Sequence, residues 1–591
     1  MKIASWMLLL FGAVLASPQK PNILIILTDD QDLHMNSMDY MPLVKVGGVM
    51  NKIPYVRYAD ESQKYITDEG VTLQNHYCTV AVCCPSRATL WTGHAAHNTN
   101  VTDVIPPYGG WPKVVQGGWN DNYLPVWLQK AGYNTYYTGK LWNYLHTDNY
   151  NRPPINGFNG SEILIDPWTY QYYEPHLTRN GRPPQSYSGQ YSTDLIKQKA
   201  LGFLEEAVSH QAPWFLTAAP IGPHAEIVVN RRDHSIDTTF PQAAQRHAHL
   251  FNDYKIPRDS SFNAKTLGAV SWIKSLQELN DTVIGYNDEF QRARLRALQA
   301  VDELVEALVQ KLDDEGVLNN TYIFYTTDNG FHISQHRMVP GKSCGYETDI
   351  HIPLVVRGPG IEKSVTLDAV TSHIDIAPTI LSLVGTPKQL DGKVIPLTGP
   401  TSHNFTSEHA AVEFWGYGDT EGDFATGKQL NNTYKGLRLT GQGYSLYYSV
   451  WCTNEVEYYD IKQDPGQMNN LASPASNQSD YILFNRPLSQ VIPRLNALLM
   501  VLKTCKGVSC TQPWNELFPG KTVTNLEGAL DASYDHFFKS QPLVTYSACE
   551  MGYIRSAEGT SRWNVYDGTK ESSVDSEWHP LHYGNDWSLF T

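Results

Sequence analysis

The chain has 591 residues, of which 41% are hydrophobic and 12% aromatic, and its formal net charge is −15 at pH 7. This length allows more than one hydrophobic core, so we expect two domains. The negative charge argues against a nucleic acid or another polyanion held by bulk electrostatics, although it leaves room for a locally basic pocket.

The first sixteen residues have the pattern of a secretory signal peptide. Lys2 precedes an apolar run at 6–11, and small residues lead to a cleavage site at Ala16. No other run of about twenty apolar residues occurs, and residues 586–591 form no anchor signal. N-glycosylation sequons start at Asn100, Asn159, Asn280, Asn319, Asn404, Asn431 and Asn477. We expect a soluble glycoprotein that is secreted or enters a lysosome- or vacuole-like lumen, with no membrane anchor.

Strand-like runs alternate with helical patterns in the first two-thirds of the chain. Residues 22–27 are nearly all apolar, as in a strand covered on both faces. A helix face extends from Leu295 to Leu312, and Gly316 is a plausible stop. Further strand-like runs lie at 133–137, 214–218, 322–325 and 352–356. The alternation predicts an α/β domain with a largely parallel sheet, whose ligands bind beyond the carboxyl ends of the strands.

The pattern of strands alternating with helices ends at about Val394. Residues 396–400 and Asn404 indicate a linker, and short β-prone runs follow at 434–439, 445–451 and 456–461. A helix is expected at 488–503, and the aromatic residues of 520–591 are expected to serve packing. Cys505 and Cys510 enclose four residues and are expected to pair, although eight cysteines are few for a disulfide-held scaffold.

Oxygen-bearing side chains follow two of the expected strands. Asp29 and Asp30 come after the first strand, and Asp328-Asn329-Gly330 after the strand at 322–325. Taken singly, each group is explained as a helix cap or a turn. At the ends of strands in one sheet, together they are better explained as an all-oxygen site for Ca²⁺ or Mg²⁺.

The segment Cys83-Cys84-Pro85-Ser86-Arg87 places a thiol, a helix start and an arginine within five residues. Pro85 fits the first turn of a helix, so we expect Cys83 just before the helix N-terminus, where free N–H groups favour an anion such as sulfate or phosphate. Arg87 lies one turn on and can reach the same anion. Structural cysteines remain an alternative. A cysteine phosphatase is weaker, because the loop is too short to wrap a phosphate.

Followed by Thr92-Gly93, this segment resembles the C-x-P-S-R-x-x-x-x-T-G signature of the type I, formylglycine-dependent sulfatases. Residues 22–30 are similar to that family's N-[IV]-[LIV]-x-[IVL]-x-x-D-D pattern. Further similar segments follow in the family's order at 138–140, 219–224, 328–330, 330–347, 372–379 and 390–392. The resemblance spans residues 20–395. The pair Cys83-Cys84 and Asn143 look most like the branch of fungal arylsulfatases and N-acetylglucosamine-6-sulfatases.

The resemblance implies an alkaline-phosphatase-like α/β fold, in which a mostly parallel sheet is sandwiched by helices. A smaller C-terminal subdomain with an antiparallel sheet completes it. We expect a signal peptide at 1–16, a catalytic domain at 17–395, and an α+β subdomain with an aromatic-rich tail at 405–591.

The resemblance also implies a sulfuric ester hydrolase. Cys83 would be converted to formylglycine by a formylglycine-generating enzyme during secretion, and its hydrate would attack sulfur to form a covalent sulfate ester. The implied catalytic residues are Cys83, Arg87, Lys140, His224 and Lys342. The implied ligands of one Ca²⁺ are Asp29, Asp30, Cys83, Asp328 and Asn329.

The substrate class is the least determined property. A small aryl sulfate is the default, and sugar sulfates of the N-acetylglucosamine-6-sulfate type or choline sulfate are alternatives. A phosphomonoester or phosphonate hydrolase of the same superfamily would place Ser or Thr as nucleophile and bind two Zn²⁺. A non-enzymatic glycoprotein would be expected to have lost some of the matched polar groups.

One position departs from the family pattern. Many sulfatases have a histidine two residues after the lysine, whereas this chain has Trp142 there and Asn143 next. Asn143 cannot serve as a general base at neutral pH. Three candidates therefore remain for the base that expels sulfate: His146, His224 and a water held by Asn143. Of these, His146 is expected to be an ordinary surface or structural histidine.

Overall fold

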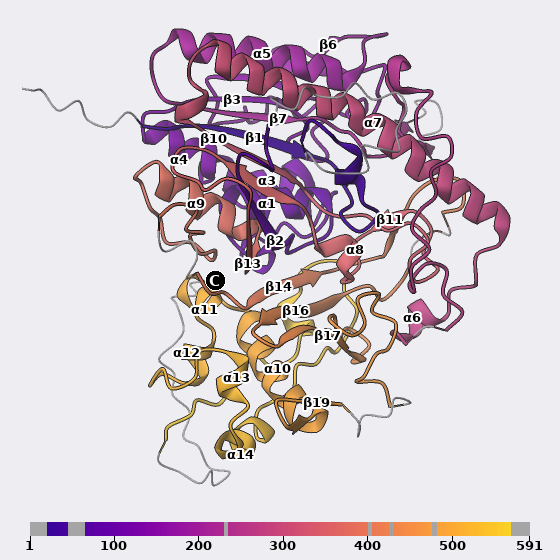
Figure 1. The fold of residues 1–591 in the computed structure, drawn as a ribbon, viewed down its shortest axis with the longest axis vertical. Helices are drawn as coiled ribbons and strands as arrows, with labels where there is room; N and C mark the ends of the chain where they lie inside the picture. Colours follow the sequence, from indigo (N-terminus) through magenta and orange to yellow (C-terminus); the bar gives the residue numbers. More distant parts are fainter. Residues whose placement is uncertain are drawn as a thin grey trace, which may run out of the picture.

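A ten-stranded sheet forms the centre of the larger part of the molecule (Figure 1). The computed structural model describes residues 20–44, 65–229, 235–399 except 267, 405–474 except 426 and 428, and 481–568. The expected signal peptide and the sequons at Asn404 and Asn477 lie outside these residues. In sheet order, the strands are β13 (Val365–Ser372), β2 (Val71–Tyr77), β12 (Leu354–Arg357), β10 (Thr321–Thr327), β1 (Asn22–Thr28), β7 (Trp214–Ala219), β3 (Asn134–Gly139), β4 (Gly160–Leu164), β5 (His176–Arg179) and β6 (Gln185–Ser186).

The middle of this sheet is parallel. Strand β1 pairs in parallel with both β10 and β7, and β7 pairs in parallel with β3. Thr28 of β1 stands opposite Thr327 of β10, so the two strands end at the same edge of the sheet. Residues that follow these strands therefore meet at one place.

Helices cover both faces of the sheet. The helices α5 (Ser192–Ser209) and α7 (Asp281–Asp314) pack on the face that buries Leu24 and Ile26. The other face, with Ile23, Ile25 and Leu27, packs against helices that include α1 (Cys83–Thr92), α3 (Gly110–Gln116), α4 (Leu124–Lys130) and α9 (Ile376–Leu383). Alternate residues of β1 thus enter two apolar layers, which is why its sequence is apolar without interruption.

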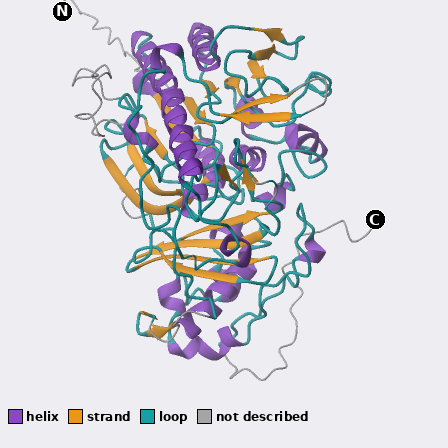
Figure 2. Cartoon of the chain, turned by 90° about the vertical axis from the view of Figure 1, so that its right-hand side faces the viewer, coloured by secondary structure: helices purple, strands orange, loops and turns teal. Residues whose placement is uncertain are grey.

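A smaller antiparallel sheet lies next to the first (Figures 1 and 2). Its strands are β14 (His409–Phe414), β16 (Tyr434–Gly441), β17 (Tyr444–Trp451) and β18 (Val456–Asp460). Helix α10 (Leu488–Leu502) shares a buried apolar cluster with β16 and β17. Most described aromatic residues of 520–568 pack in or against this cluster, as expected, among them Tyr534, Phe537, Phe538 and Trp563. Disulfides join Cys452 to Cys549 and, as expected, Cys505 to Cys510.

The fold class expected from the sequence is confirmed, with three differences of detail. Strand β12 is antiparallel to β10, a direction that a short apolar run does not encode. Helix α7 starts well before the apolar stripe, because Asn280 caps the backbone N–H groups of Thr282 and Val283. Helix α1 begins at Cys83 itself, since Ser86 N already donates to Val82 O over 3.0 Å. Among the described residues, we find no helix both long and apolar enough to span a bilayer.

Candidate active site

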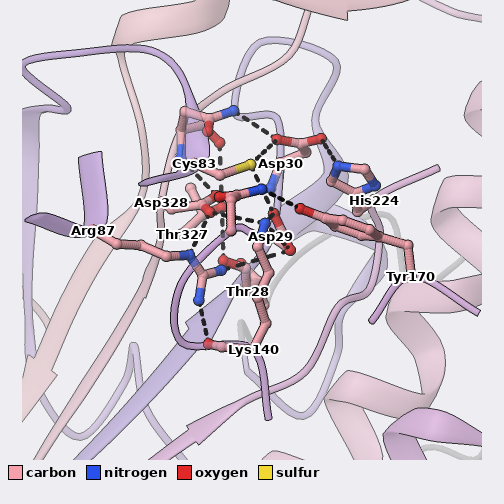
Figure 3. A network of polar contacts seen from close by, with 12 residues as sticks. Thr28, Asp29, Asp30, Cys83, Arg87, Lys140, Tyr170, His224, Thr327 and Asp328 are labelled. Atoms are coloured by element: carbon pink, nitrogen blue, oxygen red, sulfur yellow. Dashed lines mark hydrogen bonds and ion pairs between the residues drawn. The ribbon is translucent and has the colours of Figure 1, made fainter. Parts of the chain in front are cut away.

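Carboxylates meet at the edge of the sheet where β1 and β10 end (Figure 3). Asp30 N donates to Asp328 Oδ1 over 3.0 Å, and Asn329 Nδ2 donates to Asp30 Oδ1 over 2.8 Å. Asp29, Asp30, Asp328 and Asn329 are all fully buried. Asp30 has a φ of 62°, a left-handed conformation that is costly for a residue with a side chain. The backbone is held in this form by contacts between two strand ends far apart in sequence.

Helix α1 places Cys83 against these carboxylates. The Cys83 sulfur lies 3.5 Å from Asp29 Oδ1 and 4.0 Å from Asp30 Oδ1. Burial raises the pKa of this thiol well above its usual range, although Lys140 and Lys342 oppose the effect. A cysteine phosphatase needs a thiolate, which this environment disfavours. Cys84 instead lies in the apolar layer between α1 and the sheet.

Three buried cations neutralise the carboxylates. Arg87 Nε lies 2.9 Å from Asp328 Oδ2, and Lys140 Nζ lies 2.6 Å from Asp29 Oδ2. Lys342, in the short strand β11 (Gly341–Lys342), places its Nζ 2.6 Å from Asp30 Oδ2. Burial of the ammonium groups lowers the pKa of Lys140 and Lys342, but their carboxylate partners outweigh it and hold both pKa values well above the usual range. Both lysines therefore remain charged.

His224 completes the ring of polar groups. Its Nε2 lies 3.3 Å from Lys342 Nζ and 3.4 Å from Asp30 Oδ2. Its Nδ1 lies 2.7 Å from Ala225 O, a contact that requires the Nδ1 proton and leaves Nε2 with its lone pair. Burial, reinforced by Lys342, lowers the pKa of His224 to about 4. The neutral imidazole thus faces the site through Nε2.

The crowding of the carboxylates suits a divalent cation. Burial and the neighbouring Asp328 raise the pKa of Asp29 to about 7, in spite of Lys140 and Arg87. The buried Asn329 Oδ1 has no hydrogen-bond partner. Donor atoms of Asp29, Asp30, Cys83 and His224 all lie within 4.8 Å of one another. Crowded carboxylates and an unpaired amide oxygen fit a hard cation such as Ca²⁺.

The structure brings together every residue of the expected catalytic and metal-binding sets. Asp328 is the least available of the metal-binding set, because Oδ2 accepts from Arg87 and Oδ1 accepts from two backbone N–H groups. Asn143 lies next to the site, where its Nδ2 donates to the hydroxyl of Tyr170 over 2.7 Å. The described contacts of His146 are instead with Tyr144, Asn149 and Asp166.

Two residues of the site were missed from the sequence. The ring of Tyr170 stacks on His224 with centroids 4.1 Å apart, and Lys140 Nζ lies 4.8 Å from its centroid (Figure 3). Glu421 accepts from Lys342 Nζ over 2.9 Å. Tyr170 lies in a loop after β4, and Glu421 lies beyond the expected linker, so neither is adjacent to a motif. Only its place in the fold identifies each of them.

Comparisons with known proteins agree with this geometry. Residues 21–386 match the sulfatase family model. This chain belongs to the sulfatase family. Residues 335–491 also match the C-terminal region of N-sulphoglucosamine sulphohydrolase. Members of this family are hydrolases of sulfate esters, and so is this enzyme.

Similar proteins extend over most of the chain. An arylsulfatase of Volvox carteri is 36% identical over 90% of this chain and 82% of its own length. Sulfatase ppz1 of Metarhizium majus is 40% identical over 70% of this chain and 89% of its own. Human N-acetylglucosamine-6-sulfatase is 30% identical over 85% of this chain and 88% of its own.

A solved structure shares the fold. BT4656, in complex with its substrate D-glucosamine-2-N,6-O-disulfate, aligns with a TM-score of 0.58 at 23% identity, over 77% of this chain and 94% of that one. At this identity the likeness concerns the fold alone.

Proposed function

We propose that this sulfatase uses formylglycine made from Cys83 to hydrolyse small sulfate monoesters, with aryl sulfates as the preferred class. The main support is the position of Cys83, 3.5 Å from Asp29 and inside a buried ring of three cations and a histidine. A cysteine that served only for packing would not require three buried cations and a histidine around it. The aryl preference rests on the arylsulfatase among the relatives.

We further propose that Asp29, Asp30, Asp328 and Asn329, together with residue 83, hold one Ca²⁺. The support is the raised pKa of Asp29 and the unpaired Asn329 Oδ1. When bound, the ion would balance the carboxylates and activate the nucleophile at residue 83. Lys140 and Lys342, which now neutralise Asp29 and Asp30, would then have their charge available for the substrate.

The charged side chains divide into two roles. Arg87, Lys140 and Lys342 bind the sulfate oxygens and stabilise the charge that redistributes in the transition state. Lys342 Nζ, which lies 3.3 Å from the unprotonated His224 Nε2, delivers a proton to the leaving oxygen. His224 is suited to act as the base that expels sulfate, because it is neutral in the resting site and its orientation is fixed by Ala225 O.

A sugar sulfate is the second candidate substrate. Human N-acetylglucosamine-6-sulfatase matches this chain over nearly its whole length, so an N-acetylglucosamine-6-sulfate type of ester is reasonable. Tyr170 lies beside His224, and its aromatic ring could pack against either an aryl group or the face of a sugar.

We propose that the protein is secreted or enters a lumen of the secretory pathway. There it would be N-glycosylated and modified by a formylglycine-generating enzyme. The five sequon asparagines that the structure describes are all exposed, and the two disulfides suit an oxidising compartment. We also propose that residues 17–395 are the catalytic domain and that residues 405–591 complete the site, as the contact of Glu421 with Lys342 suggests.

Peptide mass spectrometry and a substrate screen test this proposal together. Trypsin releases residues 65–87 as one peptide, which should carry formylglycine at 83 and an unmodified Cys84. Sulfate release is then measured on an aryl sulfate, N-acetylglucosamine-6-sulfate and choline sulfate, and phosphate release on a phosphate monoester. Fully active enzyme with an unmodified Cys83 would refute the formylglycine proposal. Faster release of phosphate than of any sulfate would refute the proposed substrate class.

A further inference from the structure

A second group of metal-ligand side chains lies apart from the active site. His34 follows the loop of Asp29 and Asp30, and Glu347 and His351 come from the helix α8 (Glu347–Ile350) and the residue after it. Donor atoms of the three side chains all lie within 4.8 Å of one another. We propose that His34, Glu347 and His351 bind Zn²⁺, with water as the fourth ligand.

The distances fit a zinc coordination shell. His34 Nε2 lies 3.1 Å from His351 Nδ1, which in turn lies 3.5 Å from Glu347 Oε2. Ligands at about 2.0–2.1 Å from a tetrahedral Zn²⁺ are separated by about 3.3 Å. Two imidazoles and a carboxylate are also a common set of protein ligands for this ion. The ion would therefore fit with small shifts of the side chains.

Neighbouring groups already orient two of the ligands. His351 Nε2 lies 2.7 Å from Gln74 O, which requires the proton on Nε2 and leaves the lone pair of Nδ1 toward the cluster. Arg438 donates to both carboxylate oxygens of Glu347, from Nε to Oε1 over 2.7 Å and from Nη2 to Oε2 over 3.4 Å, and this fixes Oε2 at 3.5 Å from His351 Nδ1. Such supporting hydrogen bonds are the usual companions of metal-binding histidines and carboxylates.

A hydrogen bond from His34 Nε2–H to His351 Nδ1 is the simplest alternative. It accounts for the 3.1 Å contact, and Glu347 Oε2, which lies 3.5 Å from the same nitrogen, already accepts from Arg438 Nη2 over 3.4 Å. A bound cation instead requires lone pairs of His34 Nε2, His351 Nδ1 and Glu347 Oε2 to converge on one point, as their mutual distances within 4.8 Å allow. Arg438 is the cation nearest the carboxylate, and Asp32 and Asp259 contribute negative potential at His34.

The site is accessible and has a structural consequence. The His34 and His351 side chains are partly exposed, so an ion and a water can enter from solvent. His34 is four residues after Asp30, and Glu347 is five residues after Lys342. Zn²⁺ here would join the two segments that carry these active-site residues, and would stabilise the fold without touching the substrate.

Anomalous diffraction at the zinc edge tests the proposal on the full-length protein with Ca²⁺ kept in excess and Zn²⁺ added. A peak is expected at about 2.0–2.2 Å from all three donor atoms. In solution, Zn²⁺ should raise Tm by about 3 °C or more. His34→Gln should lose this rise, because glutamine keeps an N–H donor near the position of Nε2 but is a poor zinc ligand.

The matched control is His210→Gln, which changes an exposed histidine at the end of α5 and should keep the full response to Zn²⁺. A zinc peak at the Asp29–Asp30 site alone, or an equal rise in Tm for His34→Gln, would overturn the proposal. The anomalous map of the unaltered protein decides the question even if a variant fails to fold.

Discussion

Two buried carboxylates in this enzyme, Asp29 and Glu413, have pKa values shifted in opposite directions. In the active site, burial and a second carboxylate raise the pKa of Asp29 to about 7. In the cluster around Glu413 of β14, which stands opposite Lys435 of β16, the pKa of Glu413 is lowered to about 2, because His97 and Lys435 outweigh the cost of burial. At Asp29 the crowding of carboxylates outweighs the neighbouring cations, whereas at Glu413 the cations dominate.

The difference follows from the donors around each carboxylate. Glu413 accepts from His97 N and Lys435 Nζ, at 3.0 and 2.9 Å, and lies 2.9 Å from His97 Nδ1. Lys435 also donates to Lys503 O, so its ammonium group is well paired. In the active site, three carboxylates share their cations at close range and Asn329 Oδ1 stays unpaired. The site that we propose to bind an ion keeps an unpaired ligand atom, whereas Glu413 is fully paired inside the smaller sheet.

The sharpest way to break this comparison is to remove the side chain at residue 83. Cys83→Ala should fold but lose at least about 1,000-fold in turnover, because a covalent nucleophile is removed. Cys84→Ala is the matched control and should lose far less, since Cys84 only packs against the sheet. The measurement is sulfate release at saturating substrate, with circular dichroism to verify folding. Comparable losses in both variants would contradict the assignment.

The second largest effect is on stability. Glu413→Gln should lower the free energy of unfolding by about 3 kcal/mol, because Lys435 then keeps only Glu558 as a buried carboxylate partner. Asp29→Asn should cost much less in the absence of Ca²⁺, since it removes charge from a crowded site. It should, however, abolish the stabilisation by added Ca²⁺. Thermal unfolding with and without Ca²⁺ measures both, and equal losses in the two variants would refute the distinction between the clusters.

The pH dependence of stability sharpens the same contrast. The pKa of Glu413 is lowered from 4.5 to about 2 in the folded state. Its contribution to stability is therefore complete above about pH 4.5 and is lost as the pH falls toward 2. Denaturant unfolding between pH 2 and 5 should show a shallower acid loss for Glu413→Gln than for the unaltered enzyme. Parallel curves would exclude Glu413 as a source of acid sensitivity.

A smaller effect is expected at Tyr170. Tyr170→Phe removes the hydroxyl that accepts from Asn143 but keeps the ring on His224, so turnover should fall by about tenfold or less. Tyr170→Ala should cost more and also shift the pH profile, because it removes the ring that covers His224 and Lys140. An unchanged profile for Tyr170→Ala would show that the ring does not position these groups.

The smallest effect is expected at His146. Its described contacts lie with Tyr144, Asn149 and Asp166 and not with the ring of charges, so His146→Ala should leave turnover and its pH profile unchanged. A strong loss, with sulfate trapped on residue 83, would instead identify His146 as the base that expels sulfate. Asn143→His, which restores a histidine near the family's position, should be tolerated.

Much of this molecule could be predicted from local sequence. The apolar run at 22–27, the polar residues after it and the segment 83–87 each carry their information within a few residues, because strand burial, helix starts and motif chemistry are local properties. The partners of these residues in the fold could not be predicted from local sequence. Glu421 and Tyr170 have no local signal, and the antiparallel direction of β12 depends on how chain segments far apart in sequence meet.

By itself, the sequence determined the family, the α/β class and the list of residues able to act on a sulfate ester. Only the tertiary structure decided which carboxylate is crowded, which histidine nitrogen faces the site, and that His34, Glu347 and His351 converge. The reason is physical: residue types fix what chemistry is available, whereas pKa values and coordination depend on distances between atoms that only folding brings together.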